Sequence, residues 1–394
     1  MTGSIYTSSR PAPTTLVKLP PFRHEHVGSF LRPKEVLEAR AKNAAGTLDA
    51  AGLRAVEDVA IREHVAQLLK AGVKDITDGE FRRQYFHFDF LKQLDGVSIV
   101  NSKVSHEEAQ KGLPPIKLTV PAKVKHSKNI EVDNFLFLKS LVPADRVADI
   151  KITIPSPTMI HFRAGRGDIS KEAYPNDDLH AFFEDVVQAY REEISALYEA
   201  GCRYIQLDDT NLAYLTDETM RANFQKQRGE DPEAVVKGYA DLINASISTA
   251  PADMVVGIHL CKGNYQSTYF AKGSSAGYEP IAATLFGQVN VNAFFLEWED
   301  GERSGKDFSA LRHLPPTKVV VLGLVSSKYA DMESKDAIRA RLEEAEKVVP
   351  KAQLSLSPQC GFSSTVEGNA ITPADQYKKL QLCAEIADEF WGSE

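Results

Sequence analysis

The chain has 394 residues, of which 43% are hydrophobic and 25% charged, with a formal net charge of −8. These proportions are typical of globular proteins with a sizeable core, and the acidic balance argues against nucleic acid or an acidic membrane surface as the main partner. No apolar run approaches the roughly 20 residues that span a bilayer, so no integral membrane protein is predicted. Four cysteines do not make a disulfide framework in a chain this long. They are interpreted as free thiols or metal ligands in a reducing compartment, and we expect a cytoplasmic protein.

Short apolar strands and longer helical segments alternate along the chain from about residue 20. The preceding residues 1–19 are rich in Ser, Thr and Pro, lack the apolar stretch of a secretory signal, and are interpreted as a flexible leader. The predicted strands are Phe22–Gly28, Asp75–Glu80, Lys151–Pro155, Tyr204–Asp208, Met254–Cys261, Ala293–Glu297, Lys318–Val325 and Gln353–Pro358. Apolar residues at three- and four-residue spacing predict helices over Leu48–Ala71, Asp177–Ala200, Pro232–Thr249, Ser334–Val349 and Pro373–Trp391.

This alternation implies parallel strands joined by right-handed crossovers. Eight repeats close a barrel, whereas a doubly wound open sheet more often has about five or six strands. The sequence therefore predicts an α/β fold, a (β/α)8 TIM barrel, in a single catalytic domain over residues 20–394. The alternation breaks between Phe81 and Ile150, which predicts an insertion after the second strand, at about residues 84–150. A segment that covers the substrate and a dimerisation element would both give this pattern.

Polar clusters follow nearly every predicted strand, at the end where barrel enzymes carry their reactive groups. His259 and Cys261 lie two residues apart at the end of the fifth strand, where they can share one face. Glu297 ends the sixth strand, and Cys360 follows the eighth. Imidazole, thiolate and carboxylate are ligands that suit Zn²⁺ in tetrahedral geometry. Each residue alone has an ordinary alternative as a core or turn residue, but together they predict a zinc site.

The chemistry expected of this site follows from its spacing and charge. Ligands so dispersed in sequence fit a site organised by a folded barrel, whereas structural sites usually use closely spaced cysteine pairs. Two thiolates and a carboxylate outweigh the charge of Zn²⁺, for a net charge of about −1. Such a centre generates electrophiles poorly but stabilises a bound thiolate, which favours thiol alkylation over hydrolysis. The other two cysteines, Cys202 and Cys383, are interpreted as core thiols.

Six motifs in order carry a resemblance to a known family: HVGSF (26–30), DGEFRR (78–83), IQLD (205–208), HLC (259–261), LE (296–297) and PQCG (358–361). From about residue 23 to the end, the chain resembles the catalytic C-terminal barrel of cobalamin-independent methionine synthase, and in particular its short single-barrel members. The resemblance implies a barrel related to uroporphyrinogen decarboxylase. It also implies zinc held by the four predicted ligands, His259, Cys261, Glu297 and Cys360.

The same resemblance implies that the amino acid end of homocysteine binds at Ser29, Glu80 and Asp208, with the two acidic residues in the catalytic set. Two carboxylates can take up an ammonium group, and a hydroxyl with nearby backbone N–H groups can hold a carboxylate. The alternatives are an N-cap role for Asp208 and an ion pair of Glu80 with Arg82 or Arg83. His24 and His26 are left outside the catalytic set, because histidines on a first strand are more often packed or hydrogen-bonded.

One departure from the family concerns the methyl donor. In the family's folate-using members, the loop after the seventh strand carries a histidine thought to help protonate the departing folate, whereas residues 323–331 here contain none. Lys328 in this loop is equally compatible with an anion contact and with a solvated side chain. The activity expected is zinc-dependent S-methyl transfer to a small thiol such as homocysteine, from a folate or another donor. Alkylation by another electrophile such as an epoxide, a non-catalytic zinc or thiol-binding role, and a homodimer all stay open.

Overall fold

The computed structural model describes residues 6, 8–17, 20–102, 115–162, 165–177, 179–271, 273, 276–299 and 301–392. Parts of the predicted leader, and residues 103–114 of the predicted insertion, lie outside the described residues. The division of the chain into leader, barrel and insertion therefore stays a prediction. None of the described helices is both long and apolar enough to cross a membrane.

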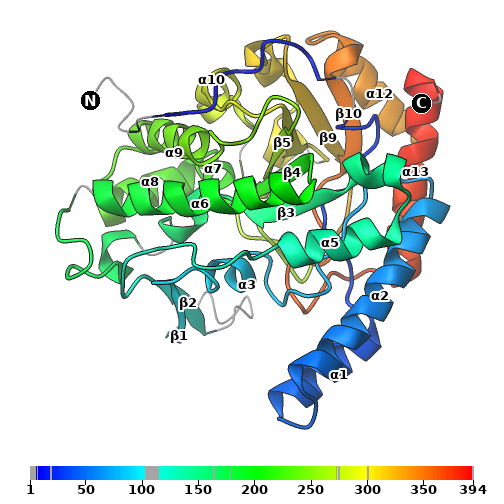
Figure 1. Ribbon diagram of the computed structural model, residues 1–394. Coiled ribbons are helices and arrows are strands. Elements are labelled where there is room, and N and C mark those ends of the chain that lie inside the picture. The colour runs from blue at the N-terminus through cyan, green and yellow to red at the C-terminus, as the bar shows by residue number, and fades with distance from the viewer. Residues whose placement is uncertain are drawn as a thin grey trace.

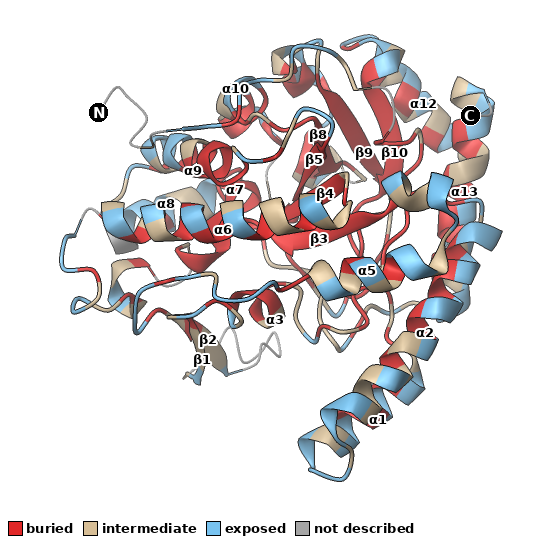
Figure 2. Ribbon diagram, viewed as in Figure 1, coloured by how far each residue is buried: buried red, intermediate tan, exposed pale blue. Residues whose placement is uncertain are grey.

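Six parallel strands form the central sheet, in the order β10-β9-β8-β5-β4-β3. They are β3 (Lys151–Pro155), β4 (Tyr204–Asp209), β5 (Val255–Leu260), β8 (Ala293–Glu297), β9 (Val319–Val325) and β10 (Leu354–Pro358). Every residue of these strands is buried, and helices surround them on the outside (Figure 2). They match the third to eighth predicted strands, whose β-branched and aliphatic residues are typical of a parallel sheet covered on both faces.

The prediction of regular strands over Phe22–Gly28 and Asp75–Glu80 is wrong. In these two described segments, only His24 and Ile76 form bridges, to Leu356 and Ile150 respectively. The barrel nevertheless closes through backbone hydrogen bonds, since Leu356 N donates to the Arg23 carbonyl at 2.9 Å. On the other side, Lys151 N donates to the Ile76 carbonyl at 2.8 Å. The eight segments together form the predicted (β/α)8 barrel.

Buried charges replace the missing ladder between these two segments. Lys151 Nζ lies 2.8 Å from both Glu25 Oε2 and Asp75 Oδ2, and Asp75 Oδ2 is also 2.8 Å from His26 Nδ1. We call Glu25, His26, Asp75 and Lys151 the closing cluster. Asp75 further accepts a hydrogen bond from the backbone N–H of His26 at 3.3 Å, so a side chain takes the place of a strand carbonyl. These polar contacts explain why the segments lack the apolar character and regular pairing of the other strands.

The longer helices lie on the outer surface of the barrel, with α6 in front of β3 and β4 and α1 projecting away from it (Figure 1). They are α1 (Lys34–Ala44), α2 (Ala50–Lys70), α5 (Val132–Leu141), α6 (His180–Ala200), α8 (Glu218–Arg228), α9 (Pro232–Ser246), α10 (Glu279–Gln288), α12 (Lys335–Glu346) and α13 (Pro373–Trp391). Asp231 caps α9, and Thr372 forms a capping box with Asp375 at the start of α13. Helix α1 was not predicted, because it buries only Val36, Ala39 and Arg40 and has no wide apolar stripe.

Shorter elements connect these helices and strands. Two small antiparallel hairpins pair β1 (Ser98–Asn101) with β2 (Ile116–Thr119) and β6 (Asn264–Tyr265) with β7 (Thr268–Tyr269). Short helices are α3 (Phe88–Leu91), α7 (Asn211–Tyr214) and α11 (Gly301–Ser304), with 3₁₀ turns over Ala144–Asp149, Pro157–Ile160, Gly165–Asp168, Ser309–His313 and Lys351–Gln353. The first hairpin and α5 lie within the predicted insertion, which thus carries its own local structure.

The N-terminal segment predicted as a flexible leader makes specific contacts around Arg10. The Arg10 side chain is buried, and its guanidinium donates to the carbonyl of Met254 at 2.9 Å and to Asn292 Oδ1 at 3.1 Å. Its backbone N–H donates to Asn244 O at 2.8 Å. This part of the segment is therefore anchored at the ends of the barrel strands opposite to those that carry the candidate site.

Candidate metal centre

The four residues predicted as metal ligands meet at the carboxyl ends of β5, β8 and β10. One ligand atom from each of His259, Cys261, Glu297 and Cys360 lies within 4.8 Å of the other three, and all four residues are buried. The Sγ atoms of Cys261 and Cys360 are 3.3 Å apart, and both cysteines are free thiols. The fold thus brings together side chains that are as much as 101 residues apart in sequence, 259 to 360.

Contacts around the cluster orient its ligand atoms. Nδ1 of His259 lies 3.2 Å from the carbonyl oxygen of Phe295, and no described residue makes a conventional hydrogen bond to its buried Nε2. The Glu297 carboxylate accepts from the backbone N–H of Lys262 at 2.8 Å and from Gln359 Nε2 at 3.2 Å. Outer contacts of this kind fix a histidine tautomer and aim a carboxylate in metal sites. The orphaned Nε2 is the atom that such a tautomer offers to a metal.

The pKa values of the four ligands are shifted, because acidic groups are buried close to one another. Burial and the neighbouring Cys360 raise the pKa of Glu297 to about 7. The contact with Cys261 and the nearby His259 hold the pKa of Cys360 well below its usual range, while that of Cys261 is raised by Cys360 and by burial. Although burial opposes it, the contact with Cys360 raises the pKa of His259 to about 9. One nitrogen, two sulfurs and one oxygen are a donor set that fits Zn²⁺.

The three residues predicted to bind an amino acid lie beside this cluster. Ser29, Glu80 and Asp208 line a cavity of about 20 Å³ together with three of the four ligands. That volume is close to the minimum of about 10–15 Å³ that a single water needs, so it matches one small group or ion. Asp208 on β4 is directly opposite His259 on β5 in the parallel register. The structure therefore places the acidic pair and the metal ligands at one end of the barrel.

The acidic pair is short of positive partners. Burial and the charge of Glu80 raise the pKa of Asp208 to about 7. Burial likewise raises the pKa of Glu80, although Arg83 and Arg32 oppose it. Oε2 of Glu80 is buried and has no hydrogen bond to any described residue. A cationic group entering the cavity would relieve both carboxyl groups.

The alternative roles considered for Glu80 and Asp208, an ion pair and a helix N-cap, are taken by neighbouring residues instead. Arg82 pairs with Asp58 at 2.7 Å and Arg83 pairs with Glu131 at 3.1 Å, and no ion pair joins either arginine to Glu80 among the described residues. After β4, the oxygen that accepts from the first helical N–H groups is Asp209 Oδ1, which accepts from Leu212 N at 2.8 Å. Asp208 instead accepts from Gln206 Nε2 at 2.7 Å, which leaves its carboxyl group in the cavity.

Ser29 is held against the loop that carries Cys360. Its carbonyl accepts from Phe362 N at 2.8 Å, and a Cβ atom on Gly361 would lie 1.9 Å from Ser29 Oγ. Only glycine at position 361 leaves room for the Ser29 hydroxyl beside the thiol. The PQCG motif thus supplies a ligand and the space for its neighbour in the same turn.

Other sequence interpretations are settled by hydrogen bonds and burial. His24 Nε2 lies 2.9 Å from Gly72 O, and His26 belongs to the closing cluster, so both histidines have structural contacts. Cys202 and Cys383 are buried away from the cluster. Sequence reasoning assigned no role to Gln359 or Tyr269, which connect Glu297 to the hairpin β6–β7. The position of Gln359 directly before Cys360 was the available signal for it.

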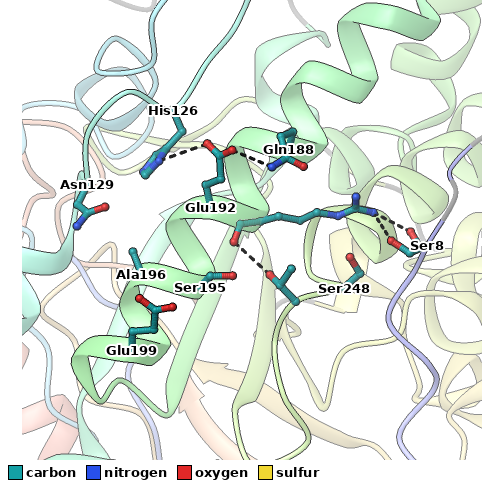
Figure 3. A pocket seen from close by; sticks show the side chains of 11 residues that line it. Ser8, His126, Asn129, Gln188, Glu192, Ser195, Ala196, Glu199 and Ser248 are labelled. Carbon is teal, nitrogen blue, oxygen red and sulfur yellow. Dashed lines mark hydrogen bonds and ion pairs between the residues drawn. The ribbon is translucent and has the colours of Figure 1, made fainter.

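A larger cavity than the one at the metal centre lies elsewhere on the protein. A hollow of about 600 Å³ lies beside α6 and is lined by Ser8, His126, Gln188 and Glu192, among others (Figure 3). Its polar groups largely satisfy one another, since Gln188 donates to Glu192 at 2.7 Å and Arg191 donates to Ser8 Oγ at 2.7 Å. This hollow contains no cluster of metal-ligating side chains among its described lining residues, so the small cavity at the barrel's end carries the candidate chemistry.

Fold and cluster together define a class: a (β/α)8 barrel that gathers histidine, cysteine and glutamate side chains at the carboxyl ends of its strands. The family described as cobalamin-independent synthase, catalytic domain, matches residues 22–379. The chain belongs to this family. Membership supports a methyltransferase of the methionine synthase type as the class of activity.

Three relatives illustrate this similarity. The chain is 40% identical to YxjG of Bacillus subtilis, an uncharacterized protein, over 95% of this chain and 96% of YxjG. It is 24% identical to the methionine synthase of Saccharolobus solfataricus, over 88% and 89% of the two chains. A crystal structure from Listeria monocytogenes, provisionally assigned as a vitamin-B12-independent methionine synthase, matches with a TM-score of 0.74 and 37% identity over 96% of this chain and all of that one. The barrel predicted from the sequence is thereby confirmed.

Proposed function

We propose that the protein is a zinc-dependent S-methyltransferase that methylates the thiol of a homocysteine-like amino acid. The observation that carries this proposal is the approach of four ligand atoms to within 4.8 Å of one another, beside two buried carboxyl groups that have raised pKa values and form no ion pair among the described residues. Similarity to proteins named methionine synthase supports the same acceptor class.

The residues of the chain would divide the work as follows. Glu80 and Asp208 bind the ammonium group of the acceptor, because two buried carboxyl groups with raised pKa values gain a counter-charge. The Ser29 hydroxyl, kept accessible by Gly361, donates to the acceptor carboxylate. These contacts at the amino acid end would fix the position of the thiol, and such positioning can supply several kcal/mol to a bimolecular reaction.

His259, Cys261, Glu297 and Cys360 would hold Zn²⁺. When bound, the zinc lowers the pKa of a thiol ligand, so that the nucleophilic thiolate exists at neutral pH. The neighbours Lys262 and Gln359 keep the Glu297 carboxylate aimed at the centre. No residue of the chain needs to act as a strong base in this scheme.

The test compares Cys261→Ser and Cys360→Ser with Cys383→Ser, which changes a buried thiol away from the cluster. Zinc content is measured by elemental analysis, and S-methylation of homocysteine by mass spectrometry with methylfolates, methylcobalamin, S-methyl compounds and, as an alternative electrophile, epoxides. We expect the first two variants to lose both zinc and turnover and the third to keep both. A zinc-free variant with full activity, or a wild type that alkylates thiols with epoxides alone, would contradict the proposal.

A further inference from the structure

A buried ammonium without an acceptor lies next to the candidate metal centre. Lys328 follows β9 and is fully buried, and Nζ has no hydrogen bond to any described residue. The ammonium lies over the ring of Tyr269, whose centroid is 4.2 Å from Nζ. Tyr269 leads directly to the centre, since its hydroxyl group accepts from Gln359 Nε2 at 3.1 Å and Gln359 also donates to Glu297.

The other buried lysines show how unusual this is within the described chain. Each of them has at least two oxygen acceptors: Lys151 in the closing cluster, Lys262 at Arg303 O and Ser304 Oγ, Lys318 at two backbone carbonyls, and Lys379 at Asp331 O and Glu333. An ammonium has three N–H donors, and leaving a charged donor unsatisfied in the interior is expensive. The fold therefore carries a cost at Lys328 that it avoids at every other buried lysine.

The loop around Lys328 is fixed, so the side chain does not lie buried by accident. Ser267 Oγ donates to the Lys328 carbonyl at 2.7 Å, and Asn369 Nδ2 donates to the carbonyl of Ser327 at 2.9 Å. Ser267 N in turn donates to Asn369 Oδ1 at 3.0 Å, which joins the two clamps. The backbone that carries the ammonium is thus fixed before any ligand arrives, as the support of a preorganised charge would be.

Charge is distributed unevenly around the mouth of the barrel. Glu80 and Asp208 follow the second and fourth of the eight segments, on either side of β3, while Lys328 follows β9, the seventh. The third and seventh segments lie across the barrel from each other. An acceptor held at the acidic pair would therefore present its thiol to the metal ligands from the side of the barrel opposite to Lys328.

Lys328 also changes the charge balance of the centre. Two thiolates, one carboxylate and a divalent ion sum to about −1, a field that would attract a cationic methyl donor such as a sulfonium. The ammonium brings this sum to about zero and favours negative charge on whatever it contacts. During methyl transfer the acceptor sulfur forms a bond to the methyl carbon. The bond from that carbon to the donor atom breaks, and its electron pair stays with the donor atom.

We propose that Lys328 forms the subsite for the departing donor atom, and that it selects neutral or anionic methyl donors, whose leaving atom becomes negatively charged, over sulfonium donors, whose leaving atom becomes neutral. This inference rests on the proposed function. In the first case the leaving group departs as an anion paired with the ammonium. In the second case the ammonium has no charge to stabilise and repels the incoming donor.

The experiment compares Lys328→Met and Lys328→Arg in the zinc-loaded protein, with Lys378→Met as a control that removes an exposed lysine from α13. Two model donors make the test independent of the natural one: a methyl benzenesulfonate, whose leaving group is an anion, and trimethylsulfonium, whose leaving group is neutral. Methylation of homocysteine is followed by mass spectrometry after subtraction of the rate without protein, and zinc content is measured in parallel.

We expect Lys328→Met to lower the rate with the sulfonate ester at least about tenfold, the size expected for losing one hydrogen bond to a charged group. The rate with trimethylsulfonium should stay the same or rise, and zinc content should not change. Lys328→Arg keeps the charge but is larger, so it should recover part of the loss. An unchanged ratio of the two rates in Lys328→Met would overturn the inference alone. A wild type that binds zinc but methylates homocysteine with neither of these donors, nor with any donor of the first test, would overturn the proposed function and the inference with it.

Discussion

Two buried groups of charged side chains sit within the same barrel, and they differ in how their charges are compensated. In the closing cluster, Lys151 contacts both Glu25 and Asp75 at 2.8 Å, and His26 contacts Asp75 at the same distance. In the metal centre, two cysteines and Glu297 face one another, and His259, whose pKa is raised to about 9, is the cationic side chain among the four ligands. The ammonium of Lys328 lies nearby without an acceptor among the described residues.

We interpret the closing cluster as structural and the metal centre as functional. Burying charges is tolerable where they pair and hydrogen-bond. In the closing cluster one ammonium contacts both carboxyl groups and joins the first two segments to β3, although Asp75 Oδ1 has no hydrogen bond to a described residue and burial raises the pKa of Glu25. In the metal centre no ion pair joins Glu297 to a described cation, and the pKa values of Glu297 and Cys261 are raised by burial and by Cys360. Unbalanced buried charge is retained at functional sites, where a ligand completes it.

The largest effect is expected where a balanced group is broken. Lys151→Met leaves Glu25 and Asp75 buried without their shared cation, and we expect the free energy of unfolding to fall by about 3–5 kcal/mol. Urea unfolding measures this. The matched control is Lys318→Met, which removes a buried ammonium that donates to the carbonyls of Phe286 and Val289 and leaves no carboxylate without its cation. A loss for Lys151→Met no greater than for Lys318→Met would contradict the structural role of the closing cluster.

The same contrast explains what the sequence could and could not predict. The sequence predicted β3, β4, β5, β8, β9 and β10 because β-branched and aliphatic residues recur along strands of a parallel sheet covered on both faces. The first two segments failed because their pairing depends on Lys151, more than 70 residues beyond Asp75 in the chain, and no local pattern encodes it. The ligands could be proposed from residue types at strand ends. Lys328 stayed ambiguous, since exposed and buried lysines look alike until packing is known.

A smaller effect, of opposite sign, is expected at Asp208. Its pKa is raised to about 7 by burial and by Glu80, whereas an unfolded aspartate titrates near about 3.9. Between these values the folded chain keeps a proton that the unfolded chain releases, so stability falls as pH rises from about 4 to 7, and the deficit persists above 7. Asp208→Asn cannot ionise. We expect it to be more stable than the wild type by roughly 2–4 kcal/mol at pH 8 and about equal at pH 3.5, while it loses affinity for the thiol amino acid.

Denaturation of the metal-free proteins at the two pH values checks this expectation. Asp217→Asn provides the control, because Asp217 accepts from Met220 N as the N-cap of α8 and asparagine is an equally good cap. It should show no gain at either pH. If Asp208→Asn were no more stable than the wild type at pH 8, the acidic pair would be compensated in the folded protein and would have no need of an ammonium ligand.

Removing the metal is expected to affect the fold least. The ligands are dispersed over β5, β8 and β10 of a barrel whose core is formed without them, so the metal-free protein should still unfold cooperatively.

Removing the metal should instead change the oxidation of the two cysteine ligands, because their Sγ atoms are 3.3 Å apart and can form a disulfide after a small movement. With a mild oxidant, we expect thiol titration of the metal-free protein to show the loss of two of its four thiols. The zinc-loaded protein should lose none, and Cys383→Ser should lose the same pair as the wild type. Equal oxidation with and without zinc would mean that these two sulfurs are not metal ligands, and the contrast between the two buried groups would then lose its chemical meaning.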